Sequence, residues 1–190
     1  MAVDHALLRQ AFVLNLAPTG MIPTPDMTPH VPTTPIAVAE AVAKCRSVGL
    51  TAVHVHARDA EGRPTSDRDT YGRFVEAVRE VAPDVVVCVS CSGRNDPDFE
   101  ARSNVLDLEG AQKPDMASLT LSSLNFPRSA SVNAPDTVVE LTSKMRDCGI
   151  KPELEVFDTD SPRAAACGSA SRTTSGSTSS GRDPAPISTR

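Results

Sequence analysis

Aromatic residues are scarce in this chain of 190 residues, which has five Phe, one Tyr and no Trp. A core without large rings must be built from Val, Leu, Ile and Ala, a composition typical of buried parallel strands covered by helices. The chain also lacks a basic cluster, and its net charge is −5. No nucleic-acid partner is therefore expected, because Lys and Arg must neutralise a bound phosphate backbone.

Long apolar segments are absent too. No apolar run approaches the roughly 20 residues that span a bilayer. The apolar stretch at residues 11–18 is short and follows Asp4 and Arg9, which is not the basic-then-apolar order of a signal peptide. We therefore expect a cytoplasmic protein with no membrane partner.

The five cysteines do not form a disulfide framework. Their odd number, without a secretory signal, predicts reduced thiols. Cys88 and Cys91 form a C-x-x-C within a β-branched run that is typical of a strand, where residues three apart face opposite sides. They are not expected to bind one metal ion, and no second C-x-x-C completes a zinc ribbon.

Short apolar runs alternate with segments of helical spacing along the chain. Strands are expected at residues 12–17, 51–56, 85–90, 115–121 and 152–157, and helices at 35–48, 68–81 and 135–148, with a short helix ending near residue 108. Thr34 is the expected N-cap of the first helix, Pro35 its first residue and Gly49 its stop signal.

This alternation predicts an α/β fold with a parallel sheet. No G-x-G-x-x-G follows the first strand, which disfavours a dinucleotide-binding domain. Polar residues cluster at the carboxyl ends of the strands, the face that carries the active site in a TIM (β/α)₈ barrel. A complete barrel needs about 250 residues. Residues 1–158 are therefore expected to form its N-terminal part, with five strands and four helices.

The composition changes after residue 158. Residues 160–190 contain eight Ser, four Thr, four Arg and one large aliphatic residue, Ile187. Such a segment cannot bury enough apolar area to offset its ordering entropy, so residues 159–190 are predicted to be a disordered tail. A regulatory tail is one alternative. Our hypothesis is an out-of-frame translation of a GC-rich gene, which resequencing the gene would test.

The strongest local motif is His54-Val-His56, at the end of the second expected strand. Residues i and i+2 of a strand point to the same side, so both imidazoles can reach one metal ion. The alternative is a pair of ordinary polar residues at a strand end. Two histidines are also one fewer than the three protein ligands that a catalytic zinc usually has, so a further ligand must come from elsewhere.

Seven blocks of sequence occur in order along the chain. They are Thr19-Gly20, His30-Val-Pro-Thr-Thr-Pro35, His54-Val-His-Ala-Arg-Asp59, Gly62-Arg-Pro64, Ser90-Cys-Ser-Gly-Arg94, Pro114-Asp-Met-Ala-Ser-Leu-Thr-Leu-Ser-Ser-Leu-Asn-Phe-Pro127 and Pro152-Glu-Leu-Glu-Val-Phe-Asp158. Over about residues 11 to 158 they resemble the β-keto acid cleavage enzymes, the family of 3-keto-5-aminohexanoate cleavage enzyme.

The resemblance implies a TIM barrel, usually a homo-oligomer, that binds one divalent metal, typically zinc. The implied reaction joins a β-keto acid and acetyl-CoA to give acetoacetate and a new acyl-CoA. Zinc would act as a Lewis acid on the substrate enolate, and a retro-Claisen step would release the product.

Individual positions carry implied roles. His54 and His56 match the two zinc-binding histidines, Ser90 a serine that binds the substrate carboxylate, Ser118 a hydroxyl residue of the same pocket, and Glu155 a catalytic strand-end glutamate. From its place after the serine-rich turn, Arg94 is expected to bind a carboxylate or a CoA phosphate. For Ser90, Ser118 and Glu155 the alternative is an ordinary solvated side chain. Arg58 and Asp59 are expected to form a structural ion pair.

The chain also departs from the family. Ile22 stands where the aminohexanoate enzyme has a glutamate for the substrate amino group, so an uncharged or differently substituted β-keto acid is expected. The late-strand glutamate ligand, the aspartate base and an arginine have no counterpart here. We therefore expect weak zinc binding, exposed edge strands and a poorly folded, inactive product. The alternatives are another metal-dependent barrel, such as a hydrolase, and a non-catalytic metal- or protein-binding fragment.

Overall fold

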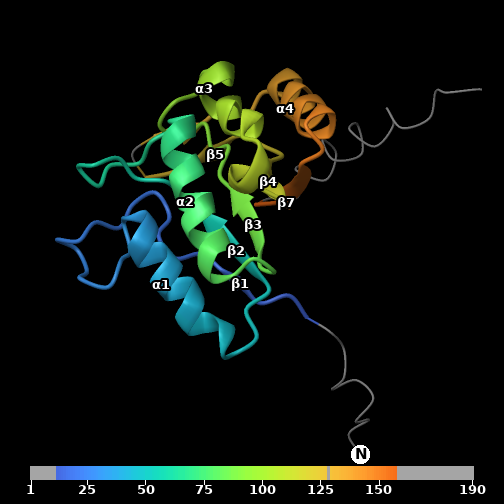
Figure 1. Ribbon diagram of the computed structural model, residues 1–190. Coiled ribbons are helices and arrows are strands. Elements are labelled where there is room, and N and C mark those ends of the chain that lie inside the picture. Colours follow the sequence, from blue (N-terminus) through green and yellow to red (C-terminus); the bar gives the residue numbers. More distant parts are fainter. Residues whose placement is uncertain (1–11, 128, 158–190) are drawn as a thin grey trace, which may run out of the picture.

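A parallel sheet forms the centre of the computed structural model, which describes residues 12–127 and 129–157 (Figure 1). Its strands lie in the order β1-β2-β3-β4-β7, and each pairs in parallel with its neighbour. Their bounds are Asn15–Leu16 (β1), Ala52–Val55 (β2), Val86–Val89 (β3), Met116–Thr120 (β4) and Lys151–Glu155 (β7). The expected five strands and their parallel arrangement are confirmed.

The connections contain the expected helices. These are α1 (Pro35–Arg46), α2 (Arg68–Val81), α3 (Phe99–Ser103) and α4 (Pro135–Asp147), with 3₁₀ turns at Asn104–Asp107 and Gly110–Gln112. The sequence did not predict β5 (Leu124–Asn125) and β6 (Ala130–Ser131), which form a small antiparallel pair in the loop before α4. Two-residue strands leave too short an alternation to recognise in a sequence.

The ends of α1 lie where the local signals place them. Thr34 Oγ1 accepts a hydrogen bond from the Ala37 N–H at 3.2 Å, and Pro35 is the first helical residue. Gly49 follows the helix with φ of 88°, a left-handed conformation that costs a residue with a Cβ atom about 1–2 kcal/mol. The predicted cap, first residue and stop signal are all confirmed.

The core lies between the sheet and its helices. Val53 and Val55 of β2 and Val87 and Val89 of β3 have no exposed surface and belong to the same cluster as Phe74 of α2. Because successive strand residues face opposite sides, the residues between these valines lie on the other face of the sheet. That face is polar and carries the candidate site.

The two outer strands are only partly covered. Phe12 and Val13, just before β1, are 77% and 74% exposed, and Leu154 in β7 is 52% exposed. Within the described parts of the chain, β1 and β7 each have one neighbouring strand, as expected for exposed edges. β1 is shorter than the predicted 12–17 because only Asn15 and Leu16 pair with β2. The predicted tail at 159–190 lies outside the described residues.

No helix within residues 12–127 and 129–157 has both the length and the apolar character needed to cross a membrane.

Candidate functional site

The polar face of the sheet arises from strand alternation and register. His54 in β2 pairs with Cys88 in β3, Cys88 with Met116 in β4, and Ser118 in β4 with Glu153 in β7. Neighbouring residues in a parallel register face the same side, opposite the valines of the core. Side chains from four strands therefore gather on one surface, although they are far apart in the sequence.

The two predicted ligand histidines lie together on this face. Their ring centroids are 4.9 Å apart, and the ring planes are tilted by 34°. His54 is within β2, whereas His56 follows the last residue of that strand. The structure therefore brings the two imidazoles to one place, as their i, i+2 spacing requires.

His56 is a neutral base in a buried setting. Its pKa is lowered from 6.5 to about 3, first by burial and then by the nearby His54 and Arg58, whereas Glu153 opposes the shift. Its Nδ1 atom is buried and has no hydrogen-bond partner among the described residues. A neutral imidazole with an unpartnered buried nitrogen is the form in which histidine binds a metal ion.

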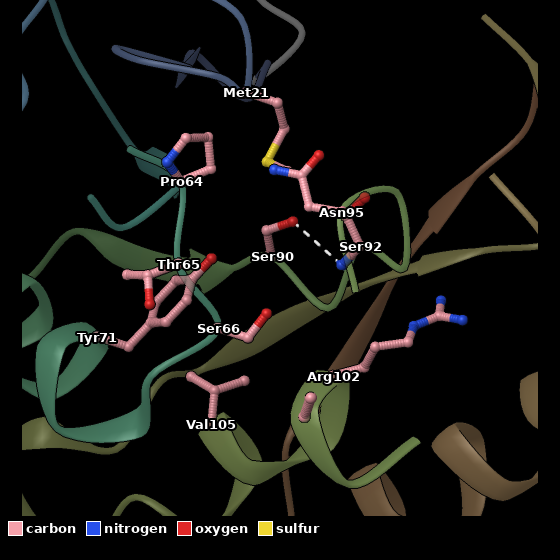
Figure 2. Close-up of a pocket in the computed structure, with 11 residues that line it drawn as sticks. Met21, Pro64, Thr65, Ser66, Tyr71, Ser90, Ser92, Asn95, Arg102 and Val105 are labelled. Atoms are coloured by element: carbon pink, nitrogen blue, oxygen red, sulfur yellow. Dashed lines mark hydrogen bonds between the residues drawn. The ribbon is translucent and has the colours of Figure 1, made fainter. Parts of the chain in front are cut away.

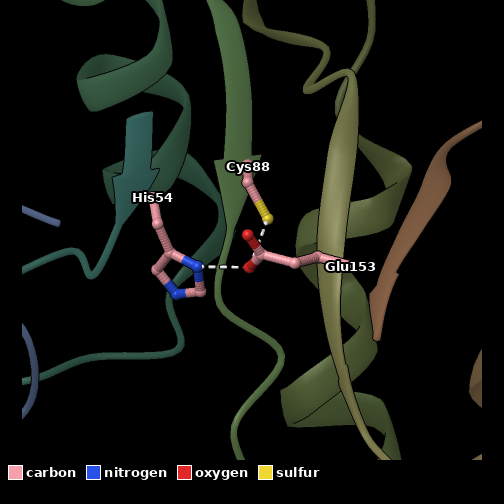
Figure 3. Close-up of side chains that lie close together, drawn as sticks. All are labelled: His54, Cys88 and Glu153. Atoms are coloured by element: carbon pink, nitrogen blue, oxygen red, sulfur yellow. Dashed lines mark hydrogen bonds and ion pairs between the residues drawn. The ribbon is translucent and has the colours of Figure 1, made fainter. Parts of the chain in front are cut away.

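His54 is held by a carboxylate that the sequence analysis did not single out. Its Nδ1 lies 2.5 Å from Glu153 Oε2, and the Cys88 thiol donates to the same oxygen at 3.3 Å (Figure 3). The hydrogen bond to His54 is the main cause that lowers the pKa of Glu153, while burial and then Glu153 raise that of Cys88. Glu153 and Glu155 are two residues apart in β7 and therefore face the same side of the sheet. This spacing was the sequence signal that could have placed Glu153 on the polar face.

The donor atoms of His54, Cys88 and Glu153 all lie within 4.8 Å of one another, and no other group of three such residues was found in the described part of the chain. Cys88 faces this cluster, whereas Cys91 lies in the hydrophobic core. The expectation that these two cysteines do not share a metal ion fits this arrangement. The sequence analysis did not place Cys88 beside Glu153.

The donor atoms of this face supply only part of a binding site for a divalent metal ion. The unpartnered nitrogen of His56 and the adjacent ring of His54 form a two-imidazole site for an ion such as zinc. No described carboxylate or thiol completes a set of three that contains both histidines.

Ser90 lines a small cavity at the carboxyl ends of β2 and β3 (Figure 2). The cavity has a volume of about 20 Å³, enough for about one water molecule. Ser90 Oγ accepts a hydrogen bond from the Ser92 N–H at 3.3 Å. Thr65 and Ser66 add further hydroxyl groups, and neither histidine lines the cavity.

Ser118 and Glu155 lie on the same polar face but have partners of their own. Ser118 is 2% exposed, and its Oγ accepts a hydrogen bond from the Cys91 N–H at 3.1 Å. The Thr120 hydroxyl donates to Glu155 Oε2 at 2.5 Å. Ser90 and Ser118 are thus buried rather than solvated. Their functional roles, and that of Glu155, stay predictions.

Arg94 packs on an aromatic ring. Its guanidinium carbon lies 3.7 Å from the centroid of the Phe126 ring, a cation–π contact between the loop after β3 and the loop after β5. The expected binding of Arg94 to a carboxylate or a phosphate stays a prediction.

The expected ion pair between Arg58 and Asp59 is wrong. Arg58 is 3% exposed, and its guanidinium donates to the backbone carbonyls of Gly20, Pro23 and Gly62 at 2.9 Å each. Asp59 instead pairs with Arg63 at 2.9 Å. The Arg58 side chain thus turns inward and joins the loop that contains Gly20 and Pro23 to the loop after β2.

A parallel sheet with helices over one face, and a polar opposite face with two histidines at a strand end, is typical of part of a (β/α)₈ barrel. The family model for beta-keto acid cleavage enzymes matches residues 11–174. The chain therefore belongs to the β-keto acid cleavage enzyme family.

Two curated relatives illustrate the relationship. The chain is 36% identical to 3-oxoadipate:acetyl-CoA acetyltransferase of Cupriavidus necator, a match that covers 80% of this chain and 51% of that protein. It is 30% identical to 3-keto-5-aminohexanoate cleavage enzyme of Fusobacterium nucleatum, with coverage of 80% and 54%. The chain thus spans about half the length of these relatives.

A solved structure shows the same fold. The ternary complex of ObcA with a C4-CoA adduct and oxalate matches with a TM-score of 0.67 at 24% identity, covering 76% of this chain and 35% of that one. At this identity the likeness shows the fold alone.

Proposed function

We propose that this chain carries the metal-binding half of an enzyme that cleaves a β-keto acid with acetyl-CoA. The observation that carries the proposal is the His54–His56 pair, with its rings 4.9 Å apart on the polar face of a family-type sheet. The acetyl-CoA co-substrate is supported by the name of the C. necator relative.

The metal role is assigned to both histidines. His56 offers a neutral ring with an unpartnered buried nitrogen, and His54 presents its ring beside it. When bound there, a zinc ion would supply the Lewis acidity that stabilises the enolate of the keto acid. β2 contains His54 and directly precedes His56, and its burial along its whole length restricts the motion of the strand that positions both rings.

Substrate roles are assigned to the strand-end residues. Ser90, which lines the small cavity, would donate a hydrogen bond from its hydroxyl group to the substrate carboxylate, with Ser118 in the next strand. Glu155 would hold a proton close to the substrate, since Thr120 already orients its carboxylate. Arg94 would contribute a cation at the rim for a carboxylate or a CoA phosphate.

Ile22 bears on the choice of keto acid. Its side chain is 53% exposed and offers no charge for a substrate ammonium group. The proposed substrate is therefore a β-keto acid without an amino group. One candidate is 3-oxoadipate, the acid in the name of the C. necator relative.

The chain by itself is proposed to bind zinc weakly and to turn over no substrate. Within residues 12–127 and 129–157, no third donor group joins the two histidines. A catalytic zinc usually has three protein ligands. This makes a non-catalytic metal-binding fragment the second candidate function.

Zinc titration of the purified full-length chain, with an assay of acetyl-CoA-dependent loss of 3-oxoadipate, tests these proposals. We expect saturable Zn²⁺ binding that His54→Asn and His56→Asn each abolish. His30→Asn is the matched control, because His30 is an exposed loop residue, and it should bind as the unmodified chain does.

Zinc binding that survives both strand substitutions would overturn the assignment of the ligands. Turnover by the unmodified chain would support the enzyme and overturn the proposal that the chain is inactive. Binding without turnover would support the fragment.

A further inference from the structure

We propose that Glu153 is a positioning residue that orients His54, so that the Nε2 atom of this ring, and not Nδ1, faces the ion it would share with His56. The inference rests on the metal role proposed above for the two histidines. It assigns to Glu153 a task distinct from that of the catalytic candidate Glu155, two residues further along the same strand.

The geometry leaves one arrangement of the proton on a neutral His54 ring. An ionised carboxylate accepts hydrogen bonds but cannot donate them. The ring nitrogen 2.5 Å from Glu153 Oε2 must therefore carry a hydrogen, and that nitrogen is Nδ1. A neutral imidazole has only one N–H group, so Nε2 retains its lone pair for a metal ion.

Glu153 is itself fixed by donors from two other strands. The Cys88 thiol donates to Oε2 at 3.3 Å, and Asn15 Nδ2 donates to Oε1 at 3.1 Å. Both carboxylate oxygens are thus occupied, which restricts rotation of the group. A carboxylate on the second nitrogen of a ligand histidine fixes the ring orientation and raises its basicity, and its loss typically costs about 10- to 100-fold in metal affinity.

The same three side chains could instead hold an ion directly, since their donor atoms lie within 4.8 Å of one another. One observation favours the positioning role. The short contact between His54 and Glu153 leaves no room for an ion between these atoms without rearrangement.

The tautomer of His54 tests the orientation without any metal. Long-range ¹H–¹⁵N correlation spectra of the apo chain, recorded under alkaline conditions with the His54 signals assigned by loss in His54→Gln, should show a proton on Nδ1 and none on Nε2. In Glu153→Leu the proton should move to Nε2, and in Glu153→Gln the Nδ1–H form should persist, because the amide oxygen can still accept. A proton on Nε2 in the unmodified chain would overturn the proposal.

Zinc affinity tests the consequence for binding. In competition with a chromophoric chelator, Glu153→Leu should bind Zn²⁺ roughly 10- to 100-fold more weakly than the unmodified chain, and Glu153→Gln should lose less. Glu140→Leu is the matched control, because Glu140 is an exposed residue of α4, and its affinity should stay within about twofold of the unmodified chain. Circular dichroism and urea unfolding of each variant establish that it is folded.

Cobalt separates the two arrangements of ligands. Bound Co²⁺ should show no thiolate charge-transfer band in the unmodified chain. Such a band, together with a loss of affinity in Cys88→Ser as large as in Glu153→Leu, would overturn the positioning role and place the ion between the three side chains. If the unmodified chain bound no zinc while His54 kept its Nδ1 proton, the metal role would fail, and the orientation of His54 by Glu153 would stand.

Discussion

Asn15 and Glu153 join the two outer strands of the described sheet, because Asn15 Nδ2 in β1 donates to Glu153 Oε1 in β7 over 3.1 Å. In a flat sheet, four inter-strand spacings of about 4.8 Å would hold these strands about 19 Å apart. An Asn and a Glu side chain cannot span that distance. The sheet must therefore curve strongly, with its polar face concave, so the curvature of a barrel is already present in five strands.

This hydrogen bond should contribute to the stability of the curved sheet. Asn15→Ala is expected to lower the free energy of unfolding by about 1 kcal/mol, measured by urea denaturation. Asn15→Asp, of nearly the same size, should lower it more at neutral pH, because it places a second carboxylate beside Glu153. Equal stability of both variants and the unmodified chain would show that the bond does not hold the edges together.

Gly93 is required by the buried Arg102. A Cβ atom at residue 93 would lie 2.7 Å from Arg102 Nη1 and 2.8 Å from its Cζ. Arg102 cannot easily yield, because it is 3% exposed and donates to the Cys91 carbonyl and to Asn133. Gly93→Ala should therefore lower the free energy of unfolding by about 1–3 kcal/mol in urea denaturation.

Gly72 in α2 provides the matched control for Gly93. A Cβ atom there would also meet an atom at 2.7 Å, but that atom is the far end of the Gln112 side chain, which can move aside. Alanine gains up to about 1 kcal/mol over glycine inside a helix. Gly72→Ala should thus be neutral or stabilising, and equal losses at both positions would contradict the role assigned to Arg102.

Alkaline pH should destabilise the fold through Cys91. Burial raises the pKa of this thiol from 9.0 to about 12. Below pH 9 the thiol is protonated in both the folded and the unfolded state, so its contribution to the free energy of unfolding is fully present. Between pH 9 and 12 the unfolded thiol ionises while the folded one does not, so the free energy of unfolding falls as the pH rises.

Urea denaturation from pH 8 upward measures this dependence. Cys91→Ala should show a shallower fall than the unmodified chain, whatever its starting stability. Cys45→Ala, at a partly exposed thiol in α1, should show the same fall as the unmodified chain. Identical slopes for the unmodified chain and Cys91→Ala would contradict the prediction.

Arg58 should be irreplaceable by lysine. Its planar guanidinium reaches the carbonyls of Gly20, Pro23 and Gly62 at once, and a single ammonium cannot match that fork. Arg58→Lys should lower the free energy of unfolding by about 2 kcal/mol and speed limited proteolysis in the loop at residues 18–34. Arg63→Lys, at an exposed ion pair, should change neither measurement.

Much of the fold could be predicted because its signals are local. The cap at Thr34, the first helical residue Pro35 and the left-handed Gly49 each act over one turn of chain, so neighbouring residues suffice to predict them. The spacing of His54 and His56 likewise placed both rings on one side of a strand. Strand ends were predicted less well, because the extent of β1 depends on how much of it a neighbour covers.

By itself, the sequence determined the order of strands and helices, the family and the pair of histidines, since each depends on residues that are close along the chain. Only the tertiary structure decided which partners those residues meet. It brought Glu153 to His54 across 99 residues and turned Arg58 away from Asp59 toward three carbonyls. The reason is physical: register and sheet curvature set these long-range contacts, and neither is encoded by any short segment alone.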